Sequence, residues 1–215
     1  MDITVRDYYL IRKNIIQMLY DRSEQQIGRF HFERGSLDLY DMIPYEAIEE
    51  IYNNANIAKS PYSQLNFDFV NNYEKIAIIF LQDTKGLDNN IEKYRNVYNL
   101  QKNETILIVL CTREKPNEYQ SRTNNKCDEV FWYKQLTFNV SKHSLVPKHE
   151  LLLPLIKNEL KELFFLNRID QLPTLLDRDP VAKWYGMRSG DICRITRENP
   201  NIGTSIMYRL VVESF

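Results

Sequence analysis

The sequence has 215 residues, of which 43% are hydrophobic and 27% are charged, and this ordinary globular composition excludes wholesale disorder. Lysine and arginine number 28 against 29 aspartates and glutamates. The resulting net charge of −1 argues against a free-standing nucleic-acid binder, which normally carries a marked positive excess. Three scattered cysteines, Cys111, Cys127 and Cys193, are too few for a disulfide framework and indicate a reducing compartment.

The N-terminus carries charge throughout and lacks the apolar core of a signal peptide. The longest apolar runs, 76–81 and 106–111, are far shorter than the roughly 20 residues that span a bilayer. The sequence therefore predicts a soluble intracellular protein without membrane contact.

Apolar residues at helical spacing predict a helix over 5–19, opened by a capping box of Thr4 and Asp7. Pro44 is predicted to open a second helix, whose apolar face carries Ile48, Ile51, Tyr52 and Ala55.

The period then changes to that of strands. Residues 76–81 and 105–111 are continuous runs rich in β-branched residues, typical of strands buried on both faces. A helix with Ile91, Tyr94 and Tyr98 at helical spacing lies between them, and 130–133 is a third strand. The order predicts a βαβ unit with parallel pairing, within an N-terminal α/β domain of residues 1–140.

The last third predicts a small α+β module over 141–215. A helix begins at Pro154 and carries Leu155, Ile156, Leu160, Leu163 and Phe164. Asp179, Pro180 and Gly186 have the residue types of an N-cap, a first helical position and a helix stop. Strands follow over 192–197 and, with clean alternation, 206–212. Because about 75 residues make a small core, we expect the module to lean on a partner.

Motifs for catalysis and cofactors are missing from the sequence. It contains no Cys-x-x-Cys, His-Glu-x-x-His or glycine-rich phosphate loop, so we expect no metal, no cofactor and no small-molecule ligand. A Mg²⁺-dependent nuclease would need carboxylates on the two buried strands, and neither strand has one. The single Glu-x-Lys, Glu159 to Lys161, lies on the predicted helix of the last third. The protein is therefore not expected to be an enzyme, and a divergent nuclease remains an alternative.

Two segments are candidates for binding. The loop after the second strand has four basic residues, Arg113, Lys115, Arg122 and Lys126, and is either a phosphate-contacting tip or an ordinary solvated loop. His143 and His149 flank Pro147, and they are either packed histidines bonded to backbone carbonyls or part of a surface. Interface-type residues follow, namely Trp184, Tyr185, Arg188, Arg194, Arg197, Tyr208 and Arg209, which favours a rigid docking surface over a site of turnover.

These same segments carry a resemblance. In order and spacing, Arg197 and the segments HSLVPKH (143–149), QLP (171–173), DPVA (179–182), YG (185–186), GD (190–191) and YRLV (208–211) match a known domain. They resemble the assembly domain of the fifth common subunit of eukaryotic RNA polymerases, a domain that stands alone as a polymerase subunit in archaea. The resemblance covers about 73 residues.

The resemblance implies a two-domain α+β protein, with an N-terminal jaw domain (1–140) and a C-terminal assembly domain (141–215). The jaw would have a nuclease-like α/β fold without catalytic residues and would line the downstream DNA cleft. The assembly domain would dock on the largest polymerase subunit. The implied docking residues are His143, Pro147, His149, Asp179, Pro180, Tyr185, Gly186, Gly190, Arg197, Tyr208 and Arg209.

In the family, the loop after the second strand carries a Thr-Pro-Ser-Ala-like stretch near downstream DNA, and here only Pro116 of that stretch is retained. The implied DNA contacts are Arg113, Lys115, Pro116 and Arg122.

The expected function is that of a non-catalytic subunit of a multisubunit DNA-directed RNA polymerase, with the other polymerase subunits and downstream duplex DNA as partners. A stand-alone duplex-DNA-binding regulator and a nuclease-fold enzyme are the alternatives. The divergent N-terminal half resembles a copy encoded by a large DNA virus or an A/T-rich protist. The expected location is the nucleus for a cellular protein, and a cytoplasmic virus factory or the virion for a viral one.

Overall fold

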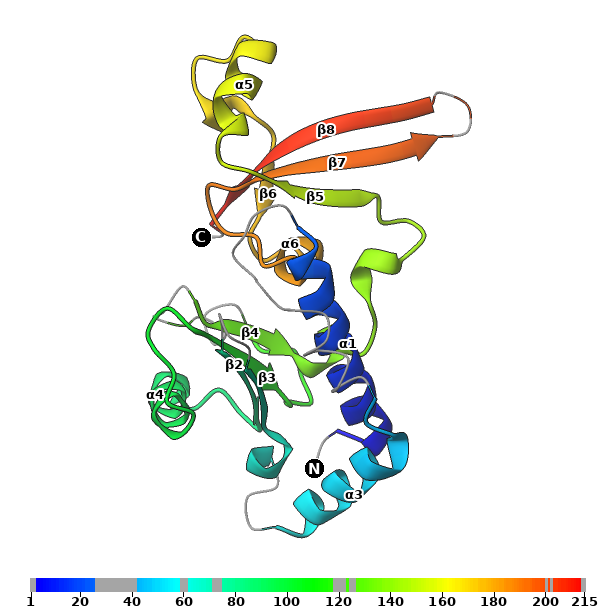
Figure 1. Cartoon of the computed structure of the whole chain (residues 1–215), viewed down its shortest axis with the longest axis vertical. Helices are drawn as coiled ribbons and strands as arrows, with labels where there is room; N and C mark the ends of the chain where they lie inside the picture. The colour runs from blue at the N-terminus through cyan, green and yellow to red at the C-terminus, as the bar shows by residue number, and fades with distance from the viewer. Residues whose placement is uncertain are drawn as a thin grey trace. The chain divides into compact units, whose positions relative to one another are not determined.

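A computed structural model describes residues 3–25, 42–58, 62–70, 75–117, 123, 127–199, 201 and 203–213. The chain divides into two compact units, one of Met1–Gln17 with His31–Phe138 and one of Met18–Phe30 with Asn139–Phe215. Each unit contains a mixed sheet and helices, which confirms the α+β class (Figure 1).

The first helix, α1 (Val5–Ser23), begins at the predicted capping box. The Asp7 amide donates to Thr4 Oγ1 at 3.1 Å, and the Thr4 amide donates to Asp7 Oδ2 at 2.9 Å. Both bonds satisfy amides that the first helical turn leaves without partners, so the helix starts where the sequence predicts.

The sheet of the first unit has the strand order β1-β2-β3-β4. Its strands are β1 (Phe67–Val70), β2 (Lys75–Leu81), β3 (Thr105–Leu110) and β4 (Glu129–Trp132). The β2–β3 and β3–β4 pairs are parallel, as the βαβ prediction requires, and β1 is antiparallel to β2. β1 was not predicted from the sequence.

Helices cover both faces of β2, which explains its continuous apolar run. Alternate residues such as Ala77 and Ile79 pack with Ile91 of α4 (Leu87–Val97). On the opposite face, the Phe80 ring meets the α1 residue Tyr8 edge-on at 5.4 Å (Figure 1). The short η1 (Tyr62–Leu65) and η3 (Tyr133–Leu136) complete this unit with α3.

The second predicted helix is α3 (Tyr45–Ile57), and Pro44 is its N-cap. Ile48, Tyr52 and Ala55 are buried as predicted. Ile51 was wrongly assigned to the buried face and is 36% exposed, because it lies at the margin of the apolar stripe.

The sheet of the second unit has the order β5-β7-β8-β6. Its strands are β5 (Lys148–Leu152), β6 (Thr174–Leu176), β7 (Ile192–Asn199) and β8 (Gly203–Val212). One face packs with α6 (Pro180–Trp184) through Ala182, and the other packs with α5 (Ile156–Leu163) through Leu160. The short η4 (Val140–Lys142) and η5 (Ile169–Gln171) connect these elements.

The end of α1 packs within this second unit. Arg22 is buried, and its Nε and Nη2 donate to the carbonyls of Trp184 and Lys183 at 2.8 and 2.6 Å. A cation is thereby held at the C-terminus of α6, where the helix leaves carbonyls unsatisfied. The indole of Trp184 also donates to Asp21 Oδ2 at 2.8 Å.

Five apolar residues of the predicted helix and final strand are exposed and not in the core. In and around α5, only Leu160 is fully buried, whereas Leu155, Leu163 and Phe164 are 81%, 64% and 46% exposed. In β8, Ile206 and Met207 are 56% and 43% exposed, since β6 pairs with this strand only from Leu210 onward. Among the described residues, no helix is long and apolar enough to span a lipid bilayer.

Candidate functional site

The C-terminal sheet brings most of the predicted docking residues to the face that α6 covers. Because side chains alternate along a strand, His149 on β5, Arg197 on β7 and Arg209 on β8 point to the same side as Cys193 and Val211 of the α6-side core. We call this side, with Asp179 at the start of α6, the α6 face.

His149 is a packed histidine bonded to a backbone carbonyl, the first of the two alternatives. It is 8% exposed, and its Nδ1 lies 2.7 Å from the Pro147 carbonyl oxygen. Burial lowers the pKa of His149, and the Pro147 carbonyl and Asp179 act in the opposite direction. His143, in contrast, is exposed, and its Nδ1 accepts the amide of Leu145 at 3.2 Å.

Asp179 caps α6 as its residue type predicts. Its Oδ1 accepts the amides of Val181 at 2.8 Å and Ala182 at 3.4 Å, and the exposed Pro180 occupies the first helical position. Gly186 ends the helix with a φ of +62°, a conformation that glycine adopts without a steric penalty.

Gly190 has a φ of +91°, and its amide donates to the Val211 carbonyl at 2.8 Å. The half-buried Tyr185 packs against the α6-side core, and burial raises the pKa of its hydroxyl. Gly190 thus fixes the backbone of the turn before β7, and Tyr185 adds to the core of the second unit.

Two guanidinium groups give the α6 face its charge. Arg197 is exposed and forms no hydrogen bond or ion pair with the described residues. Arg209 is half-buried, and its Nη1 donates to the Thr174 carbonyl at 3.0 Å, while its Nε is buried without a partner among the described residues. Two guanidinium groups against the single Asp179 carboxylate leave these residues of the α6 face with an excess of positive charge.

Tyr208 does not belong to this face. It follows the opposite alternation on β8, and its ring meets Phe164 edge-on at 5.7 Å on the side of α5. On that side Glu150 accepts from Arg194 Nε at 3.1 Å and from Lys148 Nζ at 3.0 Å. The hydrogen bond from Arg194 lowers the pKa of Glu150, so the charges of these three residues are paired.

The β7–β8 hairpin extends beyond its neighbouring strands (Figure 1). β5 pairs with β7 only as far as Thr196, and β6 pairs with β8 only from Leu210 onward. Beyond Thr196, residues 197–199 and 203–205 form a two-stranded ribbon. Next to this ribbon, Ile206 and Met207 lie where β6 no longer pairs with β8, and they are 56% and 43% exposed. A two-stranded ribbon is only marginally stable in water, so this part of the unit benefits from a partner.

The predicted DNA-contacting residues follow β3 at the carboxyl edge of the first sheet. Arg113 and Lys115 are exposed and Pro116 is half-buried. The indole of Trp132 donates to the Thr112 carbonyl at 2.9 Å and holds the start of this loop. Arg122 and its neighbour Lys126 lie outside the described residues.

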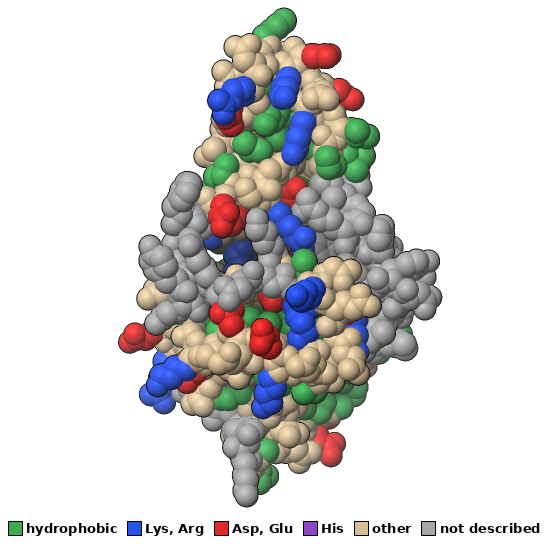
Figure 2. Space-filling view, turned by 90° about the vertical axis from the view of Figure 1, so that its left-hand side faces the viewer, with side chains coloured by type: hydrophobic (Ala, Val, Ile, Leu, Met, Phe, Trp, Pro, Cys, Tyr) green, Lys and Arg blue, Asp and Glu red, His purple; other side chains and the backbone are tan. Residues whose placement is uncertain are grey.

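Two further cations lie at the same edge, and neither was predicted from the sequence. Lys85 follows β2, and Lys134 follows β4, with its Nζ 5.0 Å from the centre of the Trp132 ring. Parallel strands place their carboxyl ends at one edge, so the parallel topology is the signal that would have grouped these lysines with Lys115. The surface of the molecule in Figure 2 otherwise mixes basic and acidic side chains.

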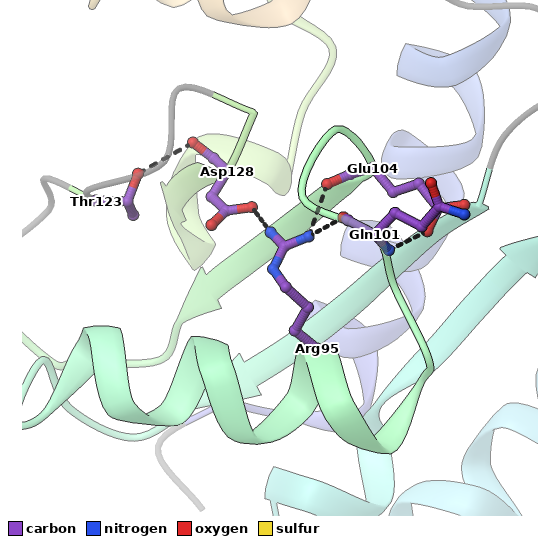
Figure 3. A network of polar contacts seen from close by, with 5 residues as sticks. All are labelled: Arg95, Gln101, Glu104, Thr123 and Asp128. Atoms are coloured by element: carbon purple, nitrogen blue, oxygen red, sulfur yellow. Dashed lines mark hydrogen bonds and ion pairs between the residues drawn. The ribbon is translucent and has the colours of Figure 1, made fainter.

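A buried ion pair was also missed. Arg95 Nη2 lies 2.5 Å from Asp128 Oδ1, and the side chains are 13% and 1% exposed (Figure 3). Arg95 also donates to the carbonyls of Gln101 and Glu104. Burial raises the pKa of Asp128, although the neighbouring guanidinium lowers it. The network joins the end of α4 to the start of β4 and is a structural feature of the first unit.

Among the described residues, no three His, Cys, Asp or Glu side chains come together in a group that could hold a metal ion. Glu159 and Lys161 lie on α5, one exposed and one half-buried, and neither contacts a second carboxylate among the described residues.

Comparison with known proteins points to one family. The model of the family "RNA polymerase Rpb5, C-terminal domain" matches residues 138–211. The subunit RPABC1 of DNA-directed RNA polymerases I, II and III from Caenorhabditis briggsae is 29% identical over 94% of both chains. Its counterpart from Dictyostelium discoideum is 28% identical over 94% of this chain and 95% of its own length. The DNA-directed RNA polymerase subunit Rpo5 of Archaeoglobus fulgidus is 44% identical over its whole length, which corresponds to 36% of this chain.

Proposed function

Because the chain belongs to the RNA polymerase Rpb5 family, we propose that it is a non-catalytic subunit of a multisubunit DNA-directed RNA polymerase. The observation that carries the proposal is the coincidence of the family match, 138–211, with the C-terminal part of the second compact unit, Asn139–Phe215. A relative that consists of this part alone is itself named as a polymerase subunit.

The finer proposal is that residues 141–215 form an assembly domain that docks on the largest polymerase subunit. The positive α6 face and the exposed β7–β8 ribbon support this role. Arg197 is an exposed cation without a partner among the described residues, and Met207 offers apolar area on the same face of the sheet. Arginine and apolar side chains together are typical anchors of protein interfaces.

Residues 1–140 form, in this proposal, a jaw domain that lines the downstream DNA cleft. Its support is the row of cations, Lys85, Lys115 and Lys134, beyond the carboxyl ends of three parallel strands. Lysines that contact phosphates add affinity without sequence preference. A chain with a net charge of −1 would act in this way only as part of a larger, more basic assembly. A cellular copy acts in the nucleus and a viral one in a virus factory or virion.

Affinity purification from native cells, followed by mass spectrometry, tests the docking proposal. We expect the two largest polymerase subunits to co-purify with the wild-type chain. Arg197→Glu should reduce their recovery strongly without lowering the melting temperature, because the side chain is exposed. Arg209→Glu should reduce both, since its guanidinium bonds Thr174. Arg6→Glu, an exposed arginine of the other unit, is the matched control.

Recovery of polymerase subunits that is unchanged in both α6-face variants would refute the docking surface. Absence of the polymerase subunits from the wild-type purification would refute the polymerase assignment itself.

A second experiment tests the contact with DNA. In the assembled enzyme, Lys115→Glu should lower the slope of log K for duplex binding against log salt concentration by about one, whereas Lys93→Glu on α4 should leave that slope unchanged. Cleavage of plasmid by the purified chain with Mg²⁺ would favour the nuclease alternative, and tight duplex binding in isolation would favour the regulator.

A further inference from the structure

An apolar patch lies on and around α5, on the side of the second unit opposite the α6 face. It consists of Leu155, Leu163, Phe164 and Phe165, which are 81%, 64%, 46% and 95% exposed. Figure 2 shows hydrophobic side chains together with basic and acidic ones in the uppermost part of the view, where α5 lies. We call these four residues the α5 patch.

Phe165 is a costly residue at its position. α5 ends in a Schellman motif, in which the Leu166 amide donates to the Lys161 carbonyl at 2.8 Å and the Phe165 amide to the Glu162 carbonyl at 3.3 Å. The motif holds Phe165 at a φ of +52°, where glycine or asparagine is usual. A left-handed backbone and an almost fully exposed ring both disfavour phenylalanine in the free protein. Binding of a partner by the ring would explain why phenylalanine occupies this position.

The exposed apolar area of the patch indicates what kind of partner it could hold. The four side chains expose on the order of 500 Å² of apolar surface, near the upper limit for a monomeric protein. A stable dimer buries about 800 Å² on each subunit, so a second copy of this chain would be held too weakly by this surface. One short amphipathic segment matches the area.

The charged residues beside the patch indicate the charge that a bound partner would carry. Lys157 and Lys161 are one turn apart, and Phe164 follows on the same side of the helix. Both lysine stems are half-buried, and neither ammonium has an ion-pair partner among the described residues. By the same spacing the exposed Glu159 lies between Leu155 and Leu163, four residues from each, so the lysines adjoin only the Phe164 end of the patch. A segment bound at that end would meet the Phe164 ring and two ammonium groups together.

We propose that the α5 patch binds a short amphipathic helix of a protein partner, with apolar residues on one face flanked by Asp or Glu. The apolar face covers Phe164 and Phe165, and the carboxylates lie opposite Lys157 and Lys161. The proposal is independent of docking through the α6 face, because it concerns the opposite face of the sheet.

Two synthetic peptides test it by fluorescence anisotropy against the full-length chain. One is a helix-forming peptide with leucines at i, i+3, i+4 and i+7 and flanking glutamates, and its twin has lysines in place of the glutamates. We expect the acidic peptide to bind at least about tenfold more tightly. Phe165→Gly should weaken this binding by at least about tenfold without lowering the melting temperature, since glycine suits the backbone.

A double substitution, Lys157→Glu with Lys161→Glu, should reverse the preference between the peptides. Leu145→Gly, which removes another exposed side chain of the same unit, should change nothing, and Arg197→Glu should bind the acidic peptide normally. Equal binding of both peptides, or full binding by Phe165→Gly, would overturn the proposal. A dimer in sedimentation that Phe165→Gly dissociates would overturn it in favour of a second copy.

Discussion

Arg95→Met isolates the energetics of the buried ion pair of the first unit. The substitution keeps a long apolar stem and removes the guanidinium that contacts Asp128 and two backbone carbonyls. Asp128 is 1% exposed in its side chain, and its Oδ2 has no hydrogen-bond partner among the described residues. Removal of one partner leaves an uncompensated buried charge, which costs about 3–5 kcal/mol at neutral pH.

The loss should depend on pH with a definite sign. Burial already raises the folded-state pKa of Asp128 above its ordinary value of 3.8, and loss of Arg95 raises it further. An unfolded chain then releases this proton at lower pH than the folded chain, so the destabilisation grows as pH rises above 3.8 and is complete above the folded pKa. Urea unfolding at pH 7 and at pH 4 measures the difference, and the loss at pH 4 should be clearly smaller.

Asp128→Asn is the matched control, because Arg95 keeps its two backbone acceptors and is 13% exposed to water. It should cost about 1–3 kcal/mol with little dependence on pH. A loss below about 1 kcal/mol for Arg95→Met at pH 7, or an equal loss at both pH values, would show that the pair does not carry the stability assigned to it.

Three further predictions concern the second unit and the thiols. Asp179→Ala should lower the free energy of unfolding by about 1 kcal/mol in thermal denaturation, and Asp179→Asn should retain most of it, since either cap can accept the Val181 amide. Burial lowers the folded-state pKa of His149 below its ordinary 6.5, so the free energy of unfolding should fall as pH drops below about 6.5. His149→Gln should make stability less dependent on pH, measured by denaturation at pH 7.5 and 5.5. The same pH dependence in the variant would contradict this prediction. Among the three thiols, half-buried Cys127 should react first with iodoacetamide, because Cys111 is fully buried and burial raises the pKa of Cys193 to about 12.

Much of the fold could be predicted because local signals and burial agree. The continuous apolar runs of β2 and β3 indicate strands covered on both faces, and Asp179 and Gly186 mark the two ends of α6. β1 was missed because Asp68 interrupts its short apolar pattern, and an edge strand of this length has little periodicity to read. The contacts of Arg22 with α6 join residues about 160 positions apart, and no local pattern predicts them.

The candidate site was harder to predict, since it depends on which side of a sheet each residue occupies. Tyr208 and Arg209 are adjacent in the sequence and therefore point to opposite faces, so only Arg209 joins His149 and Arg197. For His149 the sequence allowed two interpretations, and the bond to the Pro147 carbonyl decides between them. The lysines at the carboxyl edge of the first sheet become a group only when the parallel pairing is known.

Several features of the second unit are unfavourable for an isolated protein and have the same physical explanation. Phe165 strains the backbone by about 1–2 kcal/mol, the β7–β8 ribbon lacks neighbours, and Arg209 Nε is buried without a partner among the described residues. Selection for the stability of the free chain would remove such residues. Glycine at position 165, for example, would keep the Schellman motif without the strain. These residues are tolerated if the functional state is the bound one. A ligand or subunit that binds only the folded state stabilises that state by its binding free energy, which offsets the loss of folding stability. Two separate surfaces of one small unit, the α6 face and the α5 patch, show this pattern, and it is the pattern expected of a module that joins more than one partner.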